Sequence, residues 1–126
     1  MAVRETVCFP FKENIIDDSI NKDKGEKKIA RKLRIWFPGA IYHLMERGIR
    51  RLEIFQDEFD YQVFLEILKK ESEQKKCNIH AYCLMTNHFH LLAESQNVEI
   101  GKFMKSLAGK YAMYYNHRHS YKGHVF

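Results

Sequence analysis

From residue 40 onward, the spacing of apolar residues switches between two positions and three to four positions, and this switching limits the chain to a mixed α+β fold. Ala40–Arg47 alternates in a way that predicts a strand, with Ile41 on one face and Tyr42 on the other. Ile79–Met85 and His88–Ala93 are rich in apolar and aromatic residues and predict two further strands. The two residues between them are typical of a tight turn, so these two strands should form an antiparallel hairpin.

Helical spacing predicts two helices. Asp57 can cap the first, which should end near Lys75 and Lys76, and the second should begin at about Val98 and end near Asn116. Each helix carries one apolar stripe that would be buried. The first stripe contains Phe59, Val63, Phe64, Ile67 and Leu68, and the second contains Ile100, Phe103, Met104, Leu107, Ala108 and Tyr111. Tyr114 or Tyr115 could extend the second stripe by one more turn.

The order strand, helix, strand, strand, helix predicts a ferredoxin-like α+β fold, a split βαβ antiparallel sheet with two helices on one face. That topology closes with a fourth strand, for which only Gly123–Phe126 remains. We therefore expect the last strand and a following helix to be missing or shortened. The open sheet edge that results would favour pairing with a second copy, so a homodimer is expected.

Composition divides the chain into an extension and one domain. Residues 1–29 are polar and mixed in charge and predict a disordered extension, whereas residues 30–126 have the composition of a globular domain. No signal peptide or membrane-length apolar run is present, and the three cysteines have no metal-binding spacing. These features predict a cytoplasmic protein with no membrane partner and no disulfide framework.

The net charge of +5 comes entirely from the last 26 residues, because acidic and basic groups cancel elsewhere. A basic segment rich in tyrosine and histidine could bind nucleic-acid phosphates and bases, although a solvated helix face would look the same. Arginines after the first strand add a second basic group with the same two interpretations. The candidate DNA-binding residues are Arg47, Arg50, Arg51, Lys102, Lys105, Lys110 and Arg118.

The most specific chemical feature is the sequence His88-Phe89-His90. On a strand, the two imidazoles project from one face and Phe89 from the other. Two neutral imidazoles one step apart can hold a metal ion, but by spacing alone two structural histidines are the more common explanation. His43, on the first strand, could approach the same metal or a phosphate, or be an ordinary hydrogen-bonded sheet histidine.

The residues around this pair resemble the HUH hairpin of single-tyrosine transposases, in particular the REP-associated branch related to insertion-sequence transposases that act on single-stranded DNA. The resemblance extends in order from residue 30 to residue 126. The segments that carry it are Arg31–Ile35, Pro38–His43, Arg47–Gly48, Ile54–Phe55, Tyr61–Leu65, Tyr82–Leu92, Met104–Leu107, Tyr111, Tyr115–Asn116 and Gly123–Phe126.

This resemblance implies a DNA transposase that cleaves and joins single-stranded or hairpin DNA. His88 and His90 would be catalytic metal ligands for Mg²⁺ or Mn²⁺. His43 would then be a possible outer partner of the metal site, by its place on the first strand and not by the resemblance. The cation would polarise the scissile phosphate while a tyrosine attacks it and forms a phosphotyrosine link. Because imidazole is a poor ligand for Mg²⁺, additional oxygen ligands would be required.

In the family, the nucleophilic tyrosine lies beyond the fourth strand in a segment of the form Tyr-Ile-x-x-Asn-Pro, and the chain ends before such a segment. We therefore expect a shortened transposase without its nucleophile. Tyr115 and Tyr111 are fallback candidates, with Tyr115 expected to be the more exposed and Tyr111 expected to pack in the core. The alternatives are a non-catalytic DNA-binding remnant and a small α+β interaction module in which the two histidines are structural.

Overall fold

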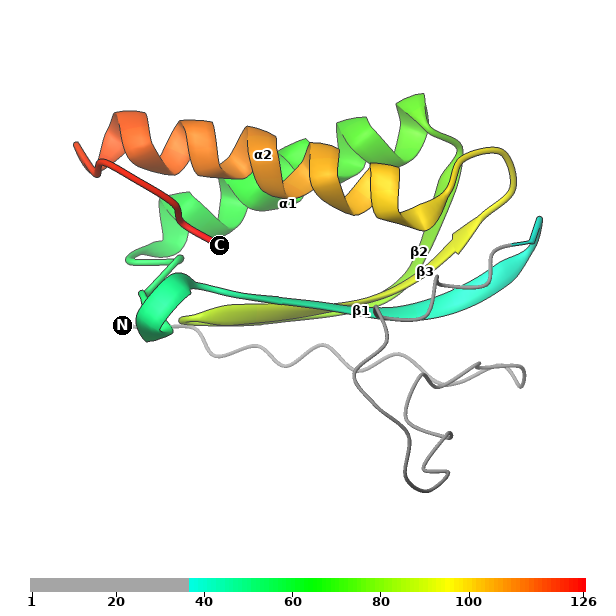
Figure 1. Cartoon of the computed structure of the whole chain (residues 1–126), viewed down its shortest axis with the longest axis horizontal. Coiled ribbons are helices and arrows are strands. Elements are labelled where there is room, and N and C mark those ends of the chain that lie inside the picture. The colour runs from blue at the N-terminus through cyan, green and yellow to red at the C-terminus, as the bar shows by residue number, and fades with distance from the viewer. Residues whose placement is uncertain (1–36) are drawn as a thin grey trace, which may run out of the picture.

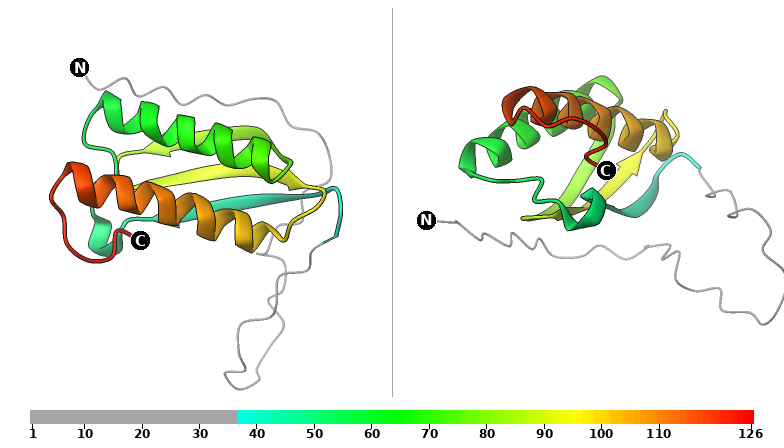
Figure 2. Two further views of the ribbon diagram at one scale, coloured as in Figure 1. Left: turned by 90° about the horizontal axis from the view of Figure 1, so that it is seen from above. Right: turned by 60° about the vertical axis from the view of Figure 1, so that its left-hand side comes forward.

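The computed structural model describes residues 37–126, so the predicted extension over residues 1–29 and the predicted domain start at residue 30 lie outside the described residues. An antiparallel sheet forms one layer, and both α-helices pack on the same face of it (Figures 1 and 2). The elements in chain order are β1 (Ala40–Arg47), a short 3-10 turn (Ile49–Arg51), α1 (Glu58–Gln74), β2 (Cys77–Met85), β3 (His88–Ser95) and α2 (Ile100–Arg118). The predicted element order and the α+β class are confirmed.

The sheet has the strand order β1-β3-β2, and both neighbouring pairs are antiparallel. The strand with the two histidines is therefore central, and β1 and β2 are its edges. The β2–β3 ladder continues to the pair of Cys77 and Ser95, which is why β2 begins two residues before, and β3 ends two residues after, the predicted bounds. The predicted turn at residues 86–87 joins these strands.

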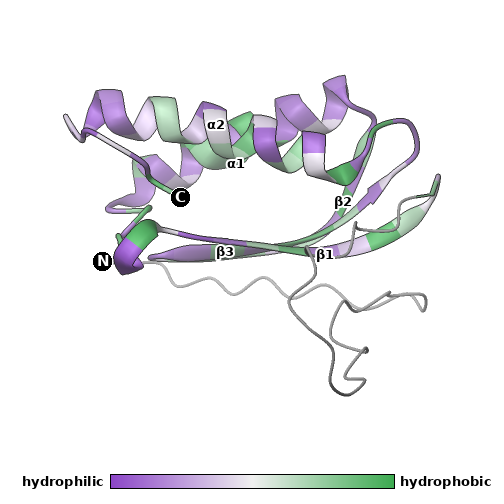
Figure 3. Ribbon diagram, in the orientation of Figure 1, coloured by the Kyte–Doolittle hydropathy of each residue, from purple (hydrophilic) through white to green (hydrophobic). Residues whose placement is uncertain are grey.

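The core lies between the sheet and the helices and is rich in aromatic rings. Phe64 of α1 lies 4.7 Å from Phe89 of β3 and 5.3 Å from Tyr111 of α2, measured between ring centroids. All three side chains are fully buried. Hydrophilic and hydrophobic residues alternate along both helices, as expected for helices that bury one face (Figure 3).

The first turn of α1 differs from the prediction. Asp57 caps the helix as expected and accepts a hydrogen bond from the Asp60 backbone N–H at 3.1 Å. Phe59, however, is 53% exposed, and the guanidinium of Arg118 lies over its ring at 4.8 Å. Asp60 is buried instead, because its carboxylate accepts hydrogen bonds from the backbone of Gln56 and from Arg118, which satisfy its charge inside the protein.

The last residues of the chain form no strand in the structure. Val125 is buried, and its carbonyl accepts a hydrogen bond from the Ile49 N–H at 2.8 Å, just after the end of β1. The ring of Phe126 packs edge-on to Phe89 with 6.0 Å between centroids. The described sheet therefore has three strands, with residues 123–126 packed against the end of β1.

Candidate functional site on the open face of the sheet

One face of the sheet packs against α1 and α2, and the opposite face carries the histidines. On β3, Phe89, Leu91 and Ala93 are buried against the helices, whereas His88 and His90 are only partly buried. The prediction that the two histidines share one face and Phe89 points the other way is thus confirmed. We call this surface the histidine face. It consists of His43, Met45 and Arg47 on β1, Cys83 and Met85 on β2, and His88 and His90 on β3.

Three imidazoles form a contiguous cluster on this face. The Nε2 atom of His43 lies 2.9 Å from the Nδ1 atom of His90, and the two rings stack with 5.1 Å between centroids. His88 meets His90 edge-on, also with 5.1 Å between centroids. The sequence allowed His43 either to approach the metal or a phosphate or to be an ordinary hydrogen-bonded sheet histidine. The structure shows it in direct contact with His90.

The ring of His88 has a separate partner. Its Nδ1 atom lies 2.6 Å from Oδ1 of the preceding residue, Asn87. The hydrogen bonds of His88 and His90 thus both involve Nδ1 atoms, and the Nε2 atom of each ring is left for a ligand. Sequence reasoning treated Asn87 only as a turn residue. Its position directly before the histidine pair was the signal that could have identified it.

Electrostatics favour the neutral form of His90. Partial burial, followed by the neighbouring His43, His88 and Arg47, lowers the pKa of His90 below its ordinary value of 6.5. A histidine must be neutral to bind a metal ion through nitrogen. Within residues 37–126, however, no three His, Cys, Asp or Glu side chains are arranged to hold a metal ion together.

Basic residues border the histidine face at one end of the sheet. Arg47 is exposed and lies directly opposite His88 in the β1–β3 ladder. Arg50 and Arg51 follow in the short turn beside the β2–β3 turn (Figure 1). Both are exposed and have left-handed backbone conformations, with φ of 51° and 60°. Such a conformation costs a non-glycine residue about 1 kcal/mol or more and often marks a functional segment.

The basic residues of α2 lie elsewhere. Because α2 packs on the opposite face of the sheet, Lys102 and Lys105 are exposed on the helix layer, away from the histidines (Figure 2). Lys110 forms an ion pair with Glu71, and Arg118 forms ion pairs with Asp57 and Asp60.

The structure therefore does not bring these four α2 residues together with the arginines after β1. Two of them are on another side of the domain, and the other two are neutralised by carboxylates of α1 and its cap.

The tyrosines are also placed away from the histidine face. Tyr111 is fully buried and donates its hydroxyl hydrogen to the carbonyl of Ile54, and burial raises its pKa. Tyr115 is only 1% exposed and donates to the carbonyl of Glu53 at 2.8 Å. The expectation that Tyr115 is the more exposed of the two is wrong, because it lies four residues after Tyr111 and continues the buried stripe of α2. Neither fallback nucleophile can reach a phosphate on the histidine face without unfolding α2.

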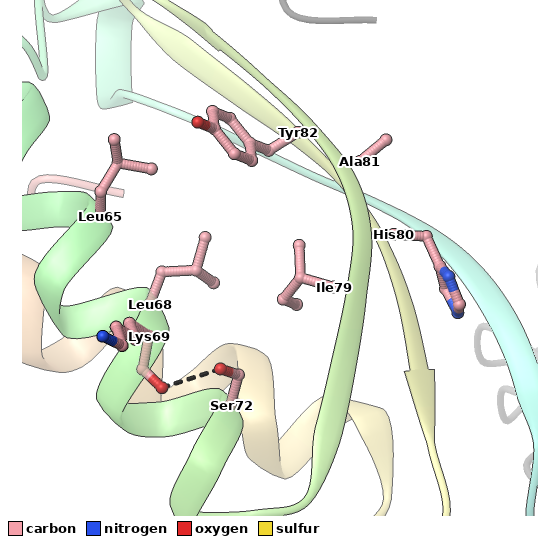
Figure 4. Close-up of a pocket in the computed structure, with 8 residues that line it drawn as sticks. All are labelled: Leu65, Leu68, Lys69, Ser72, Ile79, His80, Ala81 and Tyr82. Carbon is pink, nitrogen blue, oxygen red and sulfur yellow. Dashed lines mark hydrogen bonds between the residues drawn. The ribbon is translucent and has the colours of Figure 1, made fainter. Parts of the chain in front are cut away.

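A shallow groove between α1 and β2 does not belong to this site. It is lined by apolar side chains of both elements, among them Leu65, Leu68, Ile79 and Tyr82 (Figure 4). Tyr82 and Ile79 point toward α1, whereas His80 points away from the groove (Figure 4). Its Nε2 atom lies 2.8 Å from a carboxylate oxygen of Glu94, so His80 is separate from the three-histidine cluster.

A family model described as "Transposase IS200 like" matches residues 37–126, which is most of the chain. The chain belongs to the IS200-like transposase family. A crystal structure of a protein from Deinococcus radiodurans R1, described as a candidate transposase, has a similar fold. The two share 25% sequence identity and a TM-score of 0.55, over 70% of this chain and 68% of the other. No curated protein matches the chain.

The family assignment gives the histidine face its context. A transposase acts on DNA, so the chain is a DNA transposase domain by family and by fold. No helix within residues 37–126 combines the length and apolar character that crossing a bilayer requires. In this domain, His88 and the arginines after β1 lie at the same end of the sheet.

Proposed function

We propose that this transposase domain binds single-stranded or hairpin DNA across the histidine face, with Mg²⁺ or Mn²⁺ held by His88 and His90. The observation that carries the proposal is the cluster itself, in which both rings keep an Nε2 atom available while their Nδ1 atoms are engaged by His43 and Asn87. His43 then acts as an outer partner that orients His90 and is not a third ligand.

The donor chemistry fits such a cation only if oxygen ligands complete the set. Mg²⁺ and Mn²⁺ prefer oxygen, and two imidazoles leave most of an octahedral site unfilled. Water and phosphate oxygens of bound DNA can fill those positions. A bound divalent cation would polarise the scissile phosphate and hold it in place. Arg47 lies opposite His88 in the ladder, and Arg50 and Arg51 follow it. In this proposal the three arginines contact neighbouring phosphates.

Cleavage and strand transfer through a phosphotyrosine link require, in addition, a tyrosine aimed at this face. All seven tyrosines of the chain lie on the helix side of the sheet or in the helix layer and its connections. The two most buried, Tyr111 and Tyr115, donate their hydroxyl hydrogens to backbone carbonyls. We therefore assign phosphate and metal binding to this chain and assign no nucleophile within it. That placement also favours the second candidate function, DNA binding without cleavage.

The first test is metal binding by the purified chain, measured with Mn²⁺ by electron paramagnetic resonance. Replacing both His88 and His90 by alanine should abolish binding and leave the circular dichroism spectrum unchanged, because both side chains lie outside the core. His80→Ala is the matched control, since His80 is an exposed histidine of the same sheet that bonds to Glu94. Equal Mn²⁺ affinity in the double variant would remove the site assignment.

The second test is DNA binding, measured by fluorescence anisotropy with a hairpin oligonucleotide at several salt concentrations. Affinity should fall steeply with salt, and Arg47→Ala should weaken binding and reduce the salt slope by about 1. Lys105→Ala, on the helix layer, is the control that should change little. Absence of DNA binding at low salt would favour the interaction-module alternative.

A cytoplasmic location, where DNA is accessible and the free thiols of Cys77 and Cys83 stay reduced, agrees with the proposal.

A further inference from the structure

The hydrogen bond between Asn87 and His88 joins two consecutive residues at the start of β3. The Nδ1 atom of the imidazole lies 2.6 Å from Oδ1 of the amide, a short and well-formed contact. An amide oxygen is only an acceptor, so the hydrogen of this bond must reside on Nδ1 of His88. When the ring is neutral, its Nε2 atom then carries a lone pair and no hydrogen.

The turn that carries Asn87 is held from outside by two backbone hydrogen bonds. The Gly48 N–H donates to the carbonyl of Asn87 at 2.8 Å, and the Phe55 N–H donates to the carbonyl of Thr86 at 3.1 Å. Both donors belong to the connection between β1 and α1. The backbone of Asn87 is therefore fixed relative to β1, and from this position its side chain reaches the ring of His88.

The turn itself does not explain why an asparagine stands at this position. Asparagine is common in turns because it tolerates positive φ, but in the described part of the chain the non-glycine residues with positive φ are Arg50, Arg51, Lys76 and Ser120. Asn87 is not among them. What distinguishes asparagine from most other residues here is its acceptor oxygen, which reaches the adjacent ring.

We propose that Asn87 is a positioning residue that holds His88 in the Nδ1–H form and directs its Nε2 lone pair toward the cation site. This inference rests on the proposed metal-binding function and extends it to a residue outside the ligand pair. The arrangement matters because a neutral histidine in water favours the opposite form, with hydrogen on Nε2, which cannot bind a metal ion through Nε2. Without Asn87, ligand binding would first require the ring to change its tautomer and orientation.

The test combines two readouts on the full chain, one of which needs no metal. Long-range ¹H–¹⁵N NMR of the metal-free protein at pH 8 reports which ring nitrogen of His88 carries hydrogen. We expect the Nδ1–H form in the native sequence and in Asn87→Asp, which keeps an acceptor oxygen, and mainly the Nε2–H form in Asn87→Ala. Mn²⁺ affinity should fall about 10- to 100-fold in Asn87→Ala, the usual effect of removing an outer partner of a metal ligand. Asn87→Asp should retain most of the affinity.

Asn78→Ala is the matched control, because Asn78 is an exposed asparagine of the same sheet in register with Glu94. It should change neither the His88 tautomer nor Mn²⁺ affinity. An Nε2–H form of His88 in the native protein, or an unchanged tautomer and affinity in Asn87→Ala, would overturn the role of Asn87 while leaving the metal site standing. If the native protein has the Nδ1–H form but binds no Mn²⁺, the proposed metal function fails, and the positioning role fails with it.

Discussion

Replacing glycine by alanine should change the stability of the domain in opposite directions at Gly48 and at Gly109. A Cβ atom on Gly48 would lie 2.3 Å from the carbonyl oxygen of Leu52 and 2.9 Å from Cγ2 of Ile54. The φ of Gly48 is −58°, which alanine adopts freely, so the effect is steric and not conformational. A Cβ on Gly109, in the middle of α2, meets nothing within 4 Å.

The magnitude at Gly48 follows from what must move. The Leu52 carbonyl is backbone, and the chain beside it is fixed by the Leu52 N–H to Ile49 carbonyl hydrogen bond at 2.9 Å. Relieving the contact requires a shift of about 1 Å, which corresponds to an overpacking cost of about 1–3 kcal/mol. Weakening the Gly48 to Asn87 hydrogen bond adds about 1 kcal/mol. Gly48→Ala should therefore destabilise the domain by about 2–4 kcal/mol, which is at least about 8 °C in Tm for a domain of this size.

Gly109→Ala should instead stabilise the domain by about 0.5–1 kcal/mol, because alanine loses less backbone entropy than glycine inside a helix. Thermal and urea unfolding followed by circular dichroism measure both variants against the native chain. Because Gly48 anchors the turn that holds Asn87, Gly48→Ala should also weaken Mn²⁺ binding under conditions where the variant remains folded. Equal stability of Gly48→Ala and the native chain would refute the steric reasoning.

Three further outcomes are expected. Tyr111→Phe leaves the buried carbonyl of Ile54 without its hydrogen-bond donor and should lower the free energy of unfolding by about 1–3 kcal/mol, measured by chemical denaturation. Mn²⁺ and DNA binding should be unchanged. A loss of binding in the folded variant would contradict the position of Tyr111 on the helix side of the sheet. Burial alone would raise the pKa of Glu71, but hydrogen bonds from Lys110, Ser106 and Lys75 outweigh it and lower the pKa to about 2. The ionised form of Glu71 therefore stabilises the fold above pH 4.5, and this stabilisation is lost as the pH falls toward 2. The free energy of unfolding of the native chain should fall between pH 5 and pH 2 for this reason. In Glu71→Gln that fall should be smaller by about 1–2 kcal/mol, a value reduced for the solvent around the lysines. The open edge of β1 should lead to self-association, seen as a mass that rises with concentration in analytical ultracentrifugation; a monomer at several hundred micromolar would argue against it.

Local patterns were sufficient for the elements of the fold and for the central feature of the site. Side chains alternate along any strand, so the spacing of His88 and His90 placed both imidazoles on the face opposite Phe89 before any tertiary contact was known. The bounds of β1 and the cap at Asp57 also followed from local residue patterns. These predictions succeeded because each depends on geometry within a few residues.

The errors concern residues whose environment is made by distant parts of the chain. Asp60 is buried and Phe59 exposed because Tyr114, Arg118 and His119, at the far end of α2, supply most of the partners of the carboxylate. Tyr115 is buried for a related reason, since its hydroxyl meets the carbonyl of Glu53 across the helix layer. The spacing of four residues from Tyr111 does place Tyr115 on the buried face of α2, but no periodicity within α1 predicts that Asp60 is buried.

The sequence by itself determined the α+β order of elements, the shared face of the two HUH-like histidines and, through its motifs, the transposase family to which the chain belongs. Only the tertiary structure decided that His43 contacts His90, that Arg47 lies opposite His88, and that the lysines of α2 belong to the other layer. The physical reason is strand pairing and layer packing. Strand pairing brings His43 and His90, 47 positions apart, within hydrogen-bonding distance. The sheet separates side chains that a count of charges along the chain would group together.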